Sequence, residues 1–273
     1  MRIENHTLVA DAGEAAIPVL NSPNKGSTIT PKHLVIHYTA GRSAQSSVDW
    51  FMKPGSDASA HVVIGMDGKI TQVVPFNKKA FHAGESKWNG LTGLNSHSIG
   101  IELDNPGLMT KTGTKWFAWF GKEYPSSVVI EAKHKNENVV RGWHIFSEKQ
   151  IEACVNVSKL LMSHYQLGDI VGHDDIAPFR KTDPGPAFPM ESFKSKVLGR
   201  RDDAPTTYTV NTENTNLRAG PGMEFSILAQ LKKGTKVELM QTQLNWYNVL
   251  VVTRVTGLNE PEGWVHKNLL TKD

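Results

Sequence analysis

The chain has 273 residues, of which 39% are hydrophobic and 21% charged, so its length allows one large domain or two smaller ones and its composition excludes intrinsic disorder. No stretch approaches the roughly 18 consecutive apolar residues of a membrane-spanning helix, which excludes an integral membrane protein built from such helices. The 30 Lys and Arg nearly balance the 27 Asp and Glu, and no basic stripe with interleaved aromatic residues is present, so we expect no nucleic-acid partner.

The N-terminal segment does not resemble a secretory signal peptide. Residues 1–6 include Glu4, and no continuous apolar stretch follows them. Either the chain is exported by another route or a leader precedes the printed sequence, and the sequence does not decide between these alternatives.

Short apolar runs predict buried strands in the first half of the chain. Asp67-Gly68 separates two of these runs and indicates a hairpin, because glycine tolerates a positive φ. Asn105-Pro106-Gly107 closes the last run. The predicted strands cover residues 34–38, 61–65, 69–74 and 98–103.

Two helices are expected around these strands. The first begins near Ser43 and carries Val48 and Phe51. The second follows Phe146, where Ser147 and Gln150 have the spacing of a capping box and Phe146 and Ile151 that of a hydrophobic staple. Apolar residues then recur at helical spacing, and Gly168 is expected to end the helix.

Cys154 is the only cysteine, which excludes a disulfide framework and a cysteine-rich zinc finger. It lies on the apolar stripe of the second helix, so we expect a buried structural thiol rather than a nucleophile.

The remaining segments complete an α/β fold. Residues 108–146 are rich in Trp, Lys and Gly and are interpreted as an irregular insertion over one face of the domain. Mixed strands and helices predict a central sheet covered on both faces within residues 1–198. Residues 199–206 are charged, contain a proline and lack periodicity, so they are interpreted as a linker. Residues 207–273 show short strands between turn signals, which predicts a small all-β barrel.

Several polar residues occupy positions where apolar residues are expected. His37 and Glu102 interrupt predicted buried strands, although burying an ionisable group costs several kcal/mol unless it is paired or coordinated. His173, Lys181 and Asp183 belong to a segment rich in Gly and Pro that follows another strand. Two imidazoles and one carboxylate suit zinc with an open fourth position, but a single His in a strand is also compatible with a hydrogen-bonded core residue.

Motifs of other hydrolases and of nucleotide-binding proteins are absent from the printed sequence. It contains no H-E-x-x-H, no G-x-S-x-G and no G-x-x-x-x-G-K-[ST]. These absences argue against a thermolysin-like protease, a serine hydrolase with a nucleophile elbow and a P-loop enzyme.

From about Ile17 to Met190 the sequence resembles the zinc-dependent N-acetylmuramoyl-L-alanine amidases of the type 2 amidase family, which are related to peptidoglycan recognition proteins. Several blocks in the same order carry this resemblance. They are VIHYTAG at residues 35–41, SAHVVI at 59–64, FHAGESKW at 81–88, Asn95, SIGIEL at 98–103, GHDDIAP at 172–178 and RKTDPGP at 180–186.

The resemblance implies a central mixed sheet flanked by helices and a role for each site residue. His37, His173 and Asp183 correspond to the ligands of one zinc ion per chain. Glu102 corresponds to the general acid and base, and Lys181 to the cation beside the metal. Met190 departs from the pattern, because relatives often carry an aromatic residue there.

Four further residues are candidates for substrate binding: His61, His82, Trp88 and Asn95. For the two histidines, a structural role with hydrogen-bonded rings is an equally compatible alternative.

The C-terminal region resembles bacterial Src-homology-3-like domains from Thr209 to Leu270. The residues that carry this likeness are 216–222, 234–237 and 263–265. The implied role is binding of cell-wall peptide, and a packing or partner module is the alternative.

The implied activity is hydrolysis of the amide bond between N-acetylmuramic acid and the L-alanine of the peptidoglycan stem peptide. The expected partners are peptidoglycan or muropeptides, the expected location is the periplasm or extracellular envelope, and the expected state is a monomer. The alternatives are a recognition protein that binds peptidoglycan without cutting it and a zinc peptidase that cuts within the stem peptide.

Overall fold

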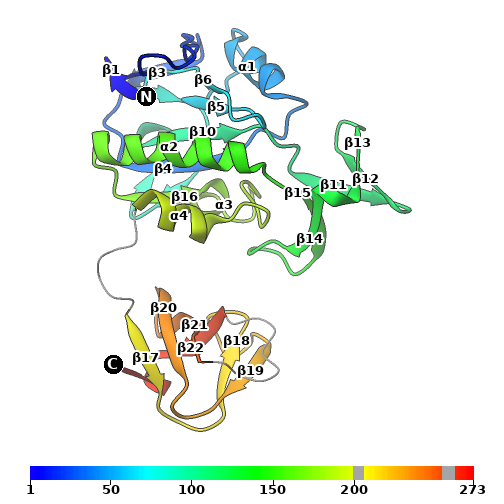
Figure 1. Ribbon diagram of the computed structural model, residues 1–273, viewed down its shortest axis with the longest axis vertical. Helices are drawn as coiled ribbons and strands as arrows, with labels where there is room; N and C mark the ends of the chain where they lie inside the picture. The colour runs from blue at the N-terminus through cyan, green and yellow to red at the C-terminus, as the bar shows by residue number, and fades with distance from the viewer. Residues whose placement is uncertain (199–205, 254–261) are drawn as a thin grey trace. The chain divides into compact units, whose positions relative to one another are not determined.

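The computed structural model describes residues 1–198, 206–253 and 262–273. Two compact units are present, Met1–Gly199 and Arg200–Asp273 (Figure 1). All of the predicted linker except Thr206 lies outside the described residues.

A five-stranded mixed sheet forms the centre of the first unit and confirms the predicted α/β fold. Its strands, in spatial order, are β16 (Asp169–Gly172), β4 (His33–Tyr38), β10 (Ser98–Leu103), β5 (Val62–Ile64) and β6 (Ile70–Gln72). The first four are parallel, and β6 forms the predicted hairpin with β5. Because the parallel strands run in one direction, their carboxyl ends meet at one edge of the sheet.

Successive side chains of β4 point to opposite faces of this sheet, and both faces are buried. Leu34 and Ile36 pack in a cluster with residues of α2 (Glu148–Tyr165) and α4 (Met190–Leu198), two helices that Figure 1 labels in green and yellow-green. Val35 lies on the opposite face and packs against Ile176 of α3 (His173–Ile176). His37 has the parity of Val35, so its side chain belongs to this second face.

The helices largely follow their sequence signals. The first, α1 (Ala44–Met52), is capped by Ser43 and buries Val48 and Phe51, as predicted. In α2 the Ser147 hydroxyl accepts a hydrogen bond from the Gln150 amide, which is half of the predicted capping box. The other half is wrong, because the Gln150 side-chain NH2 group donates to the carbonyls of Ile64 and Asp104, at 3.0 Å each, and these bonds fix the side chain away from the Ser147 amide. Gln150 Oε1, which would accept from that amide in a capping box, has no hydrogen-bond partner among the described residues.

The end of α2 also differs from the prediction. Gln166, with φ 50°, takes the left-handed position that ends the helix, and Gly168 lies two residues beyond it. The predicted burial of Cys154 is confirmed.

Residues 108–146 form a sheet, so the expectation of an irregular segment is wrong. Its antiparallel strands, in spatial order, are β13 (Glu123–Tyr124), β12 (Lys115–Ala118), β11 (Leu108–Thr112), β15 (Val140–His144) and β14 (Val129–Lys133). Met109, Trp116 and Ala118 form its small core. Trp116 lies directly over Gly142, where a Cβ atom would clash with the indole. This packing joins residues distant in sequence and is invisible to a local pattern.

Shorter elements complete the first unit. They are β1 (Arg2–Glu4), β2 (Thr7–Val9), β3 (Lys25–Thr28), β7 (Lys78–Ala80), β8 (Lys87–Trp88), β9 (Leu91–Thr92), η1 (Leu94–Ser96) and η2 (Ser126–Val128). Among the described residues, the model has no helix that combines the length and the apolar character needed to cross a membrane.

The second unit is all-β, as predicted. Its antiparallel strands, in spatial order, are β19 (Ile227–Leu231), β18 (Thr215–Arg218), β22 (Glu262–His266), β21 (Trp246–Val251), β20 (Lys236–Gln243), β17 (Thr207–Val210) and β23 (Leu270–Lys272). The helical turn η3 (Lys267–Leu269) precedes β23. Val and Leu side chains, including Leu217, Val249 and Val265, form its core.

Candidate metal centre

Three side chains converge at the carboxyl ends of β4 and β16. His37 Nδ1 lies 3.0 Å from His173 Nδ1, and each of these nitrogens lies 2.9 Å from Asp183 Oδ2. All three residues are buried, and their arrangement could hold a metal ion. The family resemblance predicted this grouping, although 146 positions separate His37 from Asp183.

Local structure explains how each side chain reaches the cluster. His37 is the fifth residue of β4 and points to the second face of the sheet. His173 begins α3 directly after β16, which pairs with β4. The Asp174 amide donates to the Asp183 carbonyl at 2.8 Å, and this bond ties the segment that carries Asp183 back to α3.

The other nitrogen of His173 is bonded within the protein. Its Nε2 lies 3.1 Å from the Ala83 carbonyl oxygen, which can only accept a hydrogen bond, so Nε2 carries the proton. In the neutral ring, Nδ1 then presents a lone pair to the cluster. This is the tautomer that a metal-ligating histidine requires.

His82 provides the corresponding contact for His37. His37 Nε2 lies 3.0 Å from His82 Nδ1, and His82 Nε2 lies 3.5 Å from the Ser98 hydroxyl oxygen. That hydroxyl donates to the Leu94 carbonyl at 2.6 Å, so its oxygen is left to accept from His82. This order of donors leaves His82 Nδ1 as the acceptor from His37 Nε2, and the lone pair of His37 Nδ1 faces Asp183.

The electrostatics favour a neutral His37 beside a charged Asp183. Burial, with a smaller contribution from His173, lowers the pKa of His37 to about 4. Burial would raise the pKa of Asp183, but the two imidazoles beside it outweigh this effect and hold that pKa well below its usual range. At neutral pH the cluster therefore combines the neutral ring of His37 with an anionic carboxylate oxygen.

Glu102 lies beside the cluster on β10. It pairs in parallel register with His37, so the two side chains share one face of the sheet. Its Oε2 atom is buried without a hydrogen-bond partner among the described residues. Burial first, then the nearby Asp183, raises the pKa of Glu102 to about 8, while the charge of Lys181 opposes this rise.

Lys181 is half-buried in the segment between α3 and Asp183. Its charge lowers the pKa of both Glu102 and His37, which places its ammonium within electrostatic reach of both groups. Lys181 therefore acts electrostatically on two of the other four predicted site residues.

The four residues predicted to bind substrate have their described polar contacts within the protein. Both ring nitrogens of His61 are used, one near the Lys78 carbonyl and one accepting from the Gly100 amide, and the ring is fully buried. His82 is the partner of His37 described above. These contacts favour structural roles for the two histidines, the alternative noted from the sequence.

Asn95 and Trp88 also stabilise the loop around the site. Asn95 Oδ1 accepts from the backbone amides of His82 and Ala83, and so holds the loop that supports both imidazoles. Trp88 Nε1 donates to Asp169 at the start of β16. Contact of Trp88 and Asn95 with substrate stays a prediction.

Asp174 was not singled out by sequence reasoning, although it follows His173 directly. It is 3% exposed, and its Oδ2 lies 3.0 Å from His134 Nε2. Lys135 forms an ion pair with the other oxygen at 2.8 Å. The connection between β14 and β15 is thereby attached to the helix that carries His173. The adjacent acids in the GHDDIAP block were the available signal.

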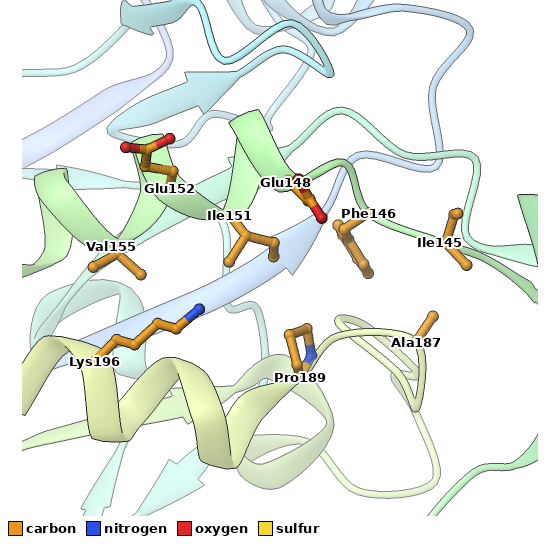
Figure 2. A pocket seen from close by; sticks show the side chains of 9 residues that line it. All are labelled: Ile145, Phe146, Glu148, Ile151, Glu152, Val155, Ala187, Pro189 and Lys196. Carbon is orange, nitrogen blue, oxygen red and sulfur yellow. The ribbon is translucent and has the colours of Figure 1, made fainter.

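Two of the grooves in the first unit border its helices. One, of about 610 Å³, borders α3 and is lined by Ile176, Ala177, Pro178, Arg180 and residues 85–87 and 92–93. The other, of about 550 Å³, lies between α2 and α4, where Lys196 extends toward α2 (Figure 2). Neither groove has a ligand of the metal-ligand cluster among its lining residues, but the first borders α3, the helix that His173 begins.

Comparison with known proteins matches both units to families. Residues 27–186 match the family described as N-acetylmuramoyl-L-alanine amidase, and residues 213–271 match the bacterial SH3 domain.

Individual amidases are also similar to this chain. N-acetylmuramoyl-L-alanine amidase AmiD of Escherichia coli strain K12 is 35% identical over 182 residues, which are 63% of this chain and 55% of AmiD. 1,6-Anhydro-N-acetylmuramyl-L-alanine amidase AmpD of the same strain is 35% identical over 139 residues, which are 51% of this chain and 58% of AmpD. The chain thus spans little more than half the length of these relatives.

A solved structure of E. coli AmiD with the substrate anhydro-N-acetylmuramic acid-L-Ala-D-gamma-Glu-L-Lys is 31% identical to this chain. The match covers 66% of this chain and 61% of that one, with a TM-score of 0.49.

Proposed function

Because this chain belongs to the N-acetylmuramoyl-L-alanine amidase family, we propose that it is a zinc-dependent hydrolase of the amide bond between N-acetylmuramic acid and the L-alanine of the stem peptide. The convergence of two imidazole nitrogens and one carboxylate oxygen beside Glu102 carries this proposal. The names of the similar amidases describe the same bond, and we extend that activity to this chain.

The donor set fits zinc. Three donors about 2.0–2.1 Å from one ion at tetrahedral angles are separated from one another by about 3.3 Å. The observed separations of 2.9–3.0 Å approach this value, and hydrogen bonds turn the lone pairs of His37 and His173 inward. Three protein ligands leave one position open, as in catalytic sites. When bound, zinc would polarise the substrate carbonyl and lower the pKa of a water molecule toward about 7.

Glu102 moves the proton in the proposed mechanism. Its carboxylate takes a proton from the attacking water and gives it to the departing amine of L-alanine. General acid–base transfer of this kind contributes about 10²–10⁴-fold to a rate. The buried Oε2 atom without a protein partner is free for this exchange, and a cation at the neighbouring ligands would bring the raised pKa of Glu102 down.

Lys181 stabilises the negative charge that develops on the carbonyl oxygen. Its ammonium acts electrostatically on Glu102 and His37, and hence on the space between them. A fixed cation in a partly buried site stabilises such charge more strongly than water does, because it needs no reorganisation during the reaction.

The second unit would keep the enzyme at its substrate. We assign residues 1–198 to the amidase domain, 199–206 to a linker and 207–273 to a Src-homology-3-like domain that binds cell-wall peptide. Tethering two modules gives effective concentrations in the mM range for short flexible linkers. We therefore propose that the protein acts at the cell envelope, on peptidoglycan or muropeptides.

Purified cell wall tests the proposal directly. The full chain is incubated with wall in the presence and absence of a chelator, and released products are identified by mass spectrometry. We expect a free N-terminal L-alanine on the stem peptide that disappears with chelation and returns with added zinc. Cleavage within the stem peptide would instead indicate a peptidase, and binding without new amines would indicate a recognition protein.

A further inference from the structure

The sheet formed by residues 108–146 carries one tryptophan that is exposed to solvent. Trp119, in the turn after β12, is 74% exposed, whereas Trp116 and Trp143 of the same sheet are 6% and 1% exposed. An indole buries a large apolar area when it packs, so leaving one exposed forgoes that stabilisation. Isolated exposed apolar residues are common, but this one is also held in place.

Hydrogen bonding and packing fix the orientation of this indole. Trp119 Nε1 donates to the Ala40 carbonyl at 2.7 Å, so its only polar atom is satisfied within the protein. Its ring packs edge-to-face with Phe120, at 5.7 Å between centroids and 83° between planes. The Arg42 guanidinium lies over the Phe120 ring at 5.3 Å. An aromatic face held in this way loses little conformational entropy when a ligand covers it.

The position of the indole connects it to the metal centre. Ala40 follows β4 three residues after His37 and has a positive φ of 50°, which few L-residues adopt. The loop is tied to the end of β10, because the Thr39 amide donates to the Leu103 carbonyl at 3.0 Å. Trp119 therefore rests on a loop that leaves the strand ends carrying His37 and Glu102.

The chemistry of this surface suits a sugar ring. A pyranose has an apolar C–H face that an aromatic ring can cover, and hydroxyl and acetamido groups at its rim that a guanidinium can contact. The groove beside α3 differs, because its lining combines the apolar side chains of Ile176, Ala177 and Pro178 with charged ones of both signs, a mixed surface that suits a peptide. The bond assigned above joins a sugar to a peptide, so a complete site needs both kinds of surface.

We propose that Trp119, together with Phe120 and Arg42, forms a saccharide-binding surface for an N-acetylhexosamine residue of the substrate's glycan. This inference rests on the proposed amidase function for the identity of the ligand. It predicts that the enzyme distinguishes substrates by whether they retain sugar, beyond recognising the amide bond.

Binding of a soluble N-acetylglucosamine oligomer to the full chain gives the first test. Affinity is measured by calorimetry for the wild type, Trp119→Ala and Trp119→Phe. Trp50→Ala is the matched control, because this indole on α1 is 49% exposed but lies beside Lys53 instead of the metal centre. We expect Trp119→Ala to weaken binding at least about tenfold, as hot-spot truncations do, Trp119→Phe to weaken it less, and Trp50→Ala to leave it unchanged.

Steady-state hydrolysis gives the second test. Two substrates are compared: a muropeptide with its disaccharide, and an N-lactoyl stem peptide that keeps the amide bond but lacks sugar. We expect Trp119→Ala to raise KM for the muropeptide about tenfold with little change in kcat, and to leave kcat/KM for the lactoyl peptide unchanged.

The outcomes separate this inference from the proposed function. Equal behaviour of Trp119→Ala and the wild type in both assays overturns the sugar surface while the amidase activity stands. An equal loss on both substrates also overturns it, because the indole then supports the loop only. Sugar binding lost only in Trp119→Ala, without hydrolysis by any variant, supports the surface and overturns the amidase assignment.

Discussion

The two units of the chain bury different kinds of side chain. The first unit buries ionisable groups near the strand ends, including His37, Glu102, His173 and Asp183. The second buries mainly Val and Leu, and its buried Arg218 donates to the carbonyls of Met223 and Phe225. Burying ionisable groups costs free energy unless partners compensate. In the second unit, the buried charge of Arg218 is compensated by hydrogen bonds to a nearby loop. In the first unit, the buried groups converge on the candidate metal centre.

The hydrogen-bond partners sharpen this contrast. His37 and His173 are held from behind by His82 and the Ala83 carbonyl, so their inward atoms are left for a ligand. Glu102 has a buried oxygen without a partner among the described residues. Native proteins leave few buried polar atoms unsatisfied, so such an atom beside the metal-ligand cluster indicates a reactant or a ligand.

Removing the anionic ligand is expected to have the largest effect. Asp183→Ala leaves only the two imidazole ligands, and we expect zinc affinity and hydrolysis to fall together by more than about 100-fold. Elemental analysis after dialysis and the wall assay measure the two losses. Asp67→Ala, in the exposed turn between β5 and β6, is the control and should change neither. Full activity in Asp183→Ala would remove this carboxylate from the metal site.

Replacing the proton carrier should separate binding from turnover. Glu102→Gln keeps the size of the side chain and removes its base, so we expect normal zinc content and a loss of about 10²–10⁴-fold in kcat. Turnover at the wild-type rate would exclude Glu102 from the mechanism.

The raised pKa of Glu102 should also appear in stability. In metal-free protein its pKa is about 8, above the unfolded value of about 4.3, so the unfolded state loses this proton first as pH rises. The free energy of unfolding should therefore fall between about pH 4 and pH 8, by an amount on the order of a few kcal/mol from this group.

Urea unfolding of chelated protein measures this effect, with tryptophan fluorescence reporting mainly on the first unit. The difference in unfolding free energy between Glu102→Gln and the wild type should grow as pH rises through this window. A difference that is independent of pH would show that the carboxyl is solvated.

Removing the hydrogen-bond partner of His37 should reduce zinc affinity by a smaller factor than removing a ligand. His82→Ala removes the acceptor for His37 Nε2, and we expect zinc affinity to fall about 10–100-fold. His61→Ala is the matched control, because the nitrogens of this buried ring hydrogen-bond to backbone groups instead of a ligand. The His61→Ala substitution should lower the stability of the protein and leave its zinc affinity unchanged. Equal zinc affinity of folded His82→Ala and the wild type would contradict the supporting role.

A substitution in the hydrophobic core of the second unit should have the smallest effect on catalysis. Leu217→Ala creates a cavity among fully buried side chains and should destabilise that unit by about 2–5 kcal/mol. Turnover of a soluble muropeptide should be unchanged, whereas retention on intact wall should fall. A matching loss of soluble turnover would show that the two units are energetically linked.

The sequence alone was sufficient for the elements with strong local signals. Ser43 predicted the start of α1, and Asp67-Gly68 predicted the hairpin of β5 and β6, because capping and turn chemistry act over a few residues. His37 and Glu102 were conspicuous as polar residues within apolar strands, and the ordered motif blocks identified the family. These inferences needed no knowledge of which distant residues meet.

Only the tertiary structure decided where side chains find their partners. Gln150 leaves the predicted capping box because the carbonyls of Ile64 and Asp104 lie within its reach. The insertion forms a sheet because Trp116 covers Gly142 from another strand, and His82 supports His37 from 45 residues away. Such contacts depend on chain crossings that local periodicity does not encode, since hydrogen bonding and packing are settled by distance in space.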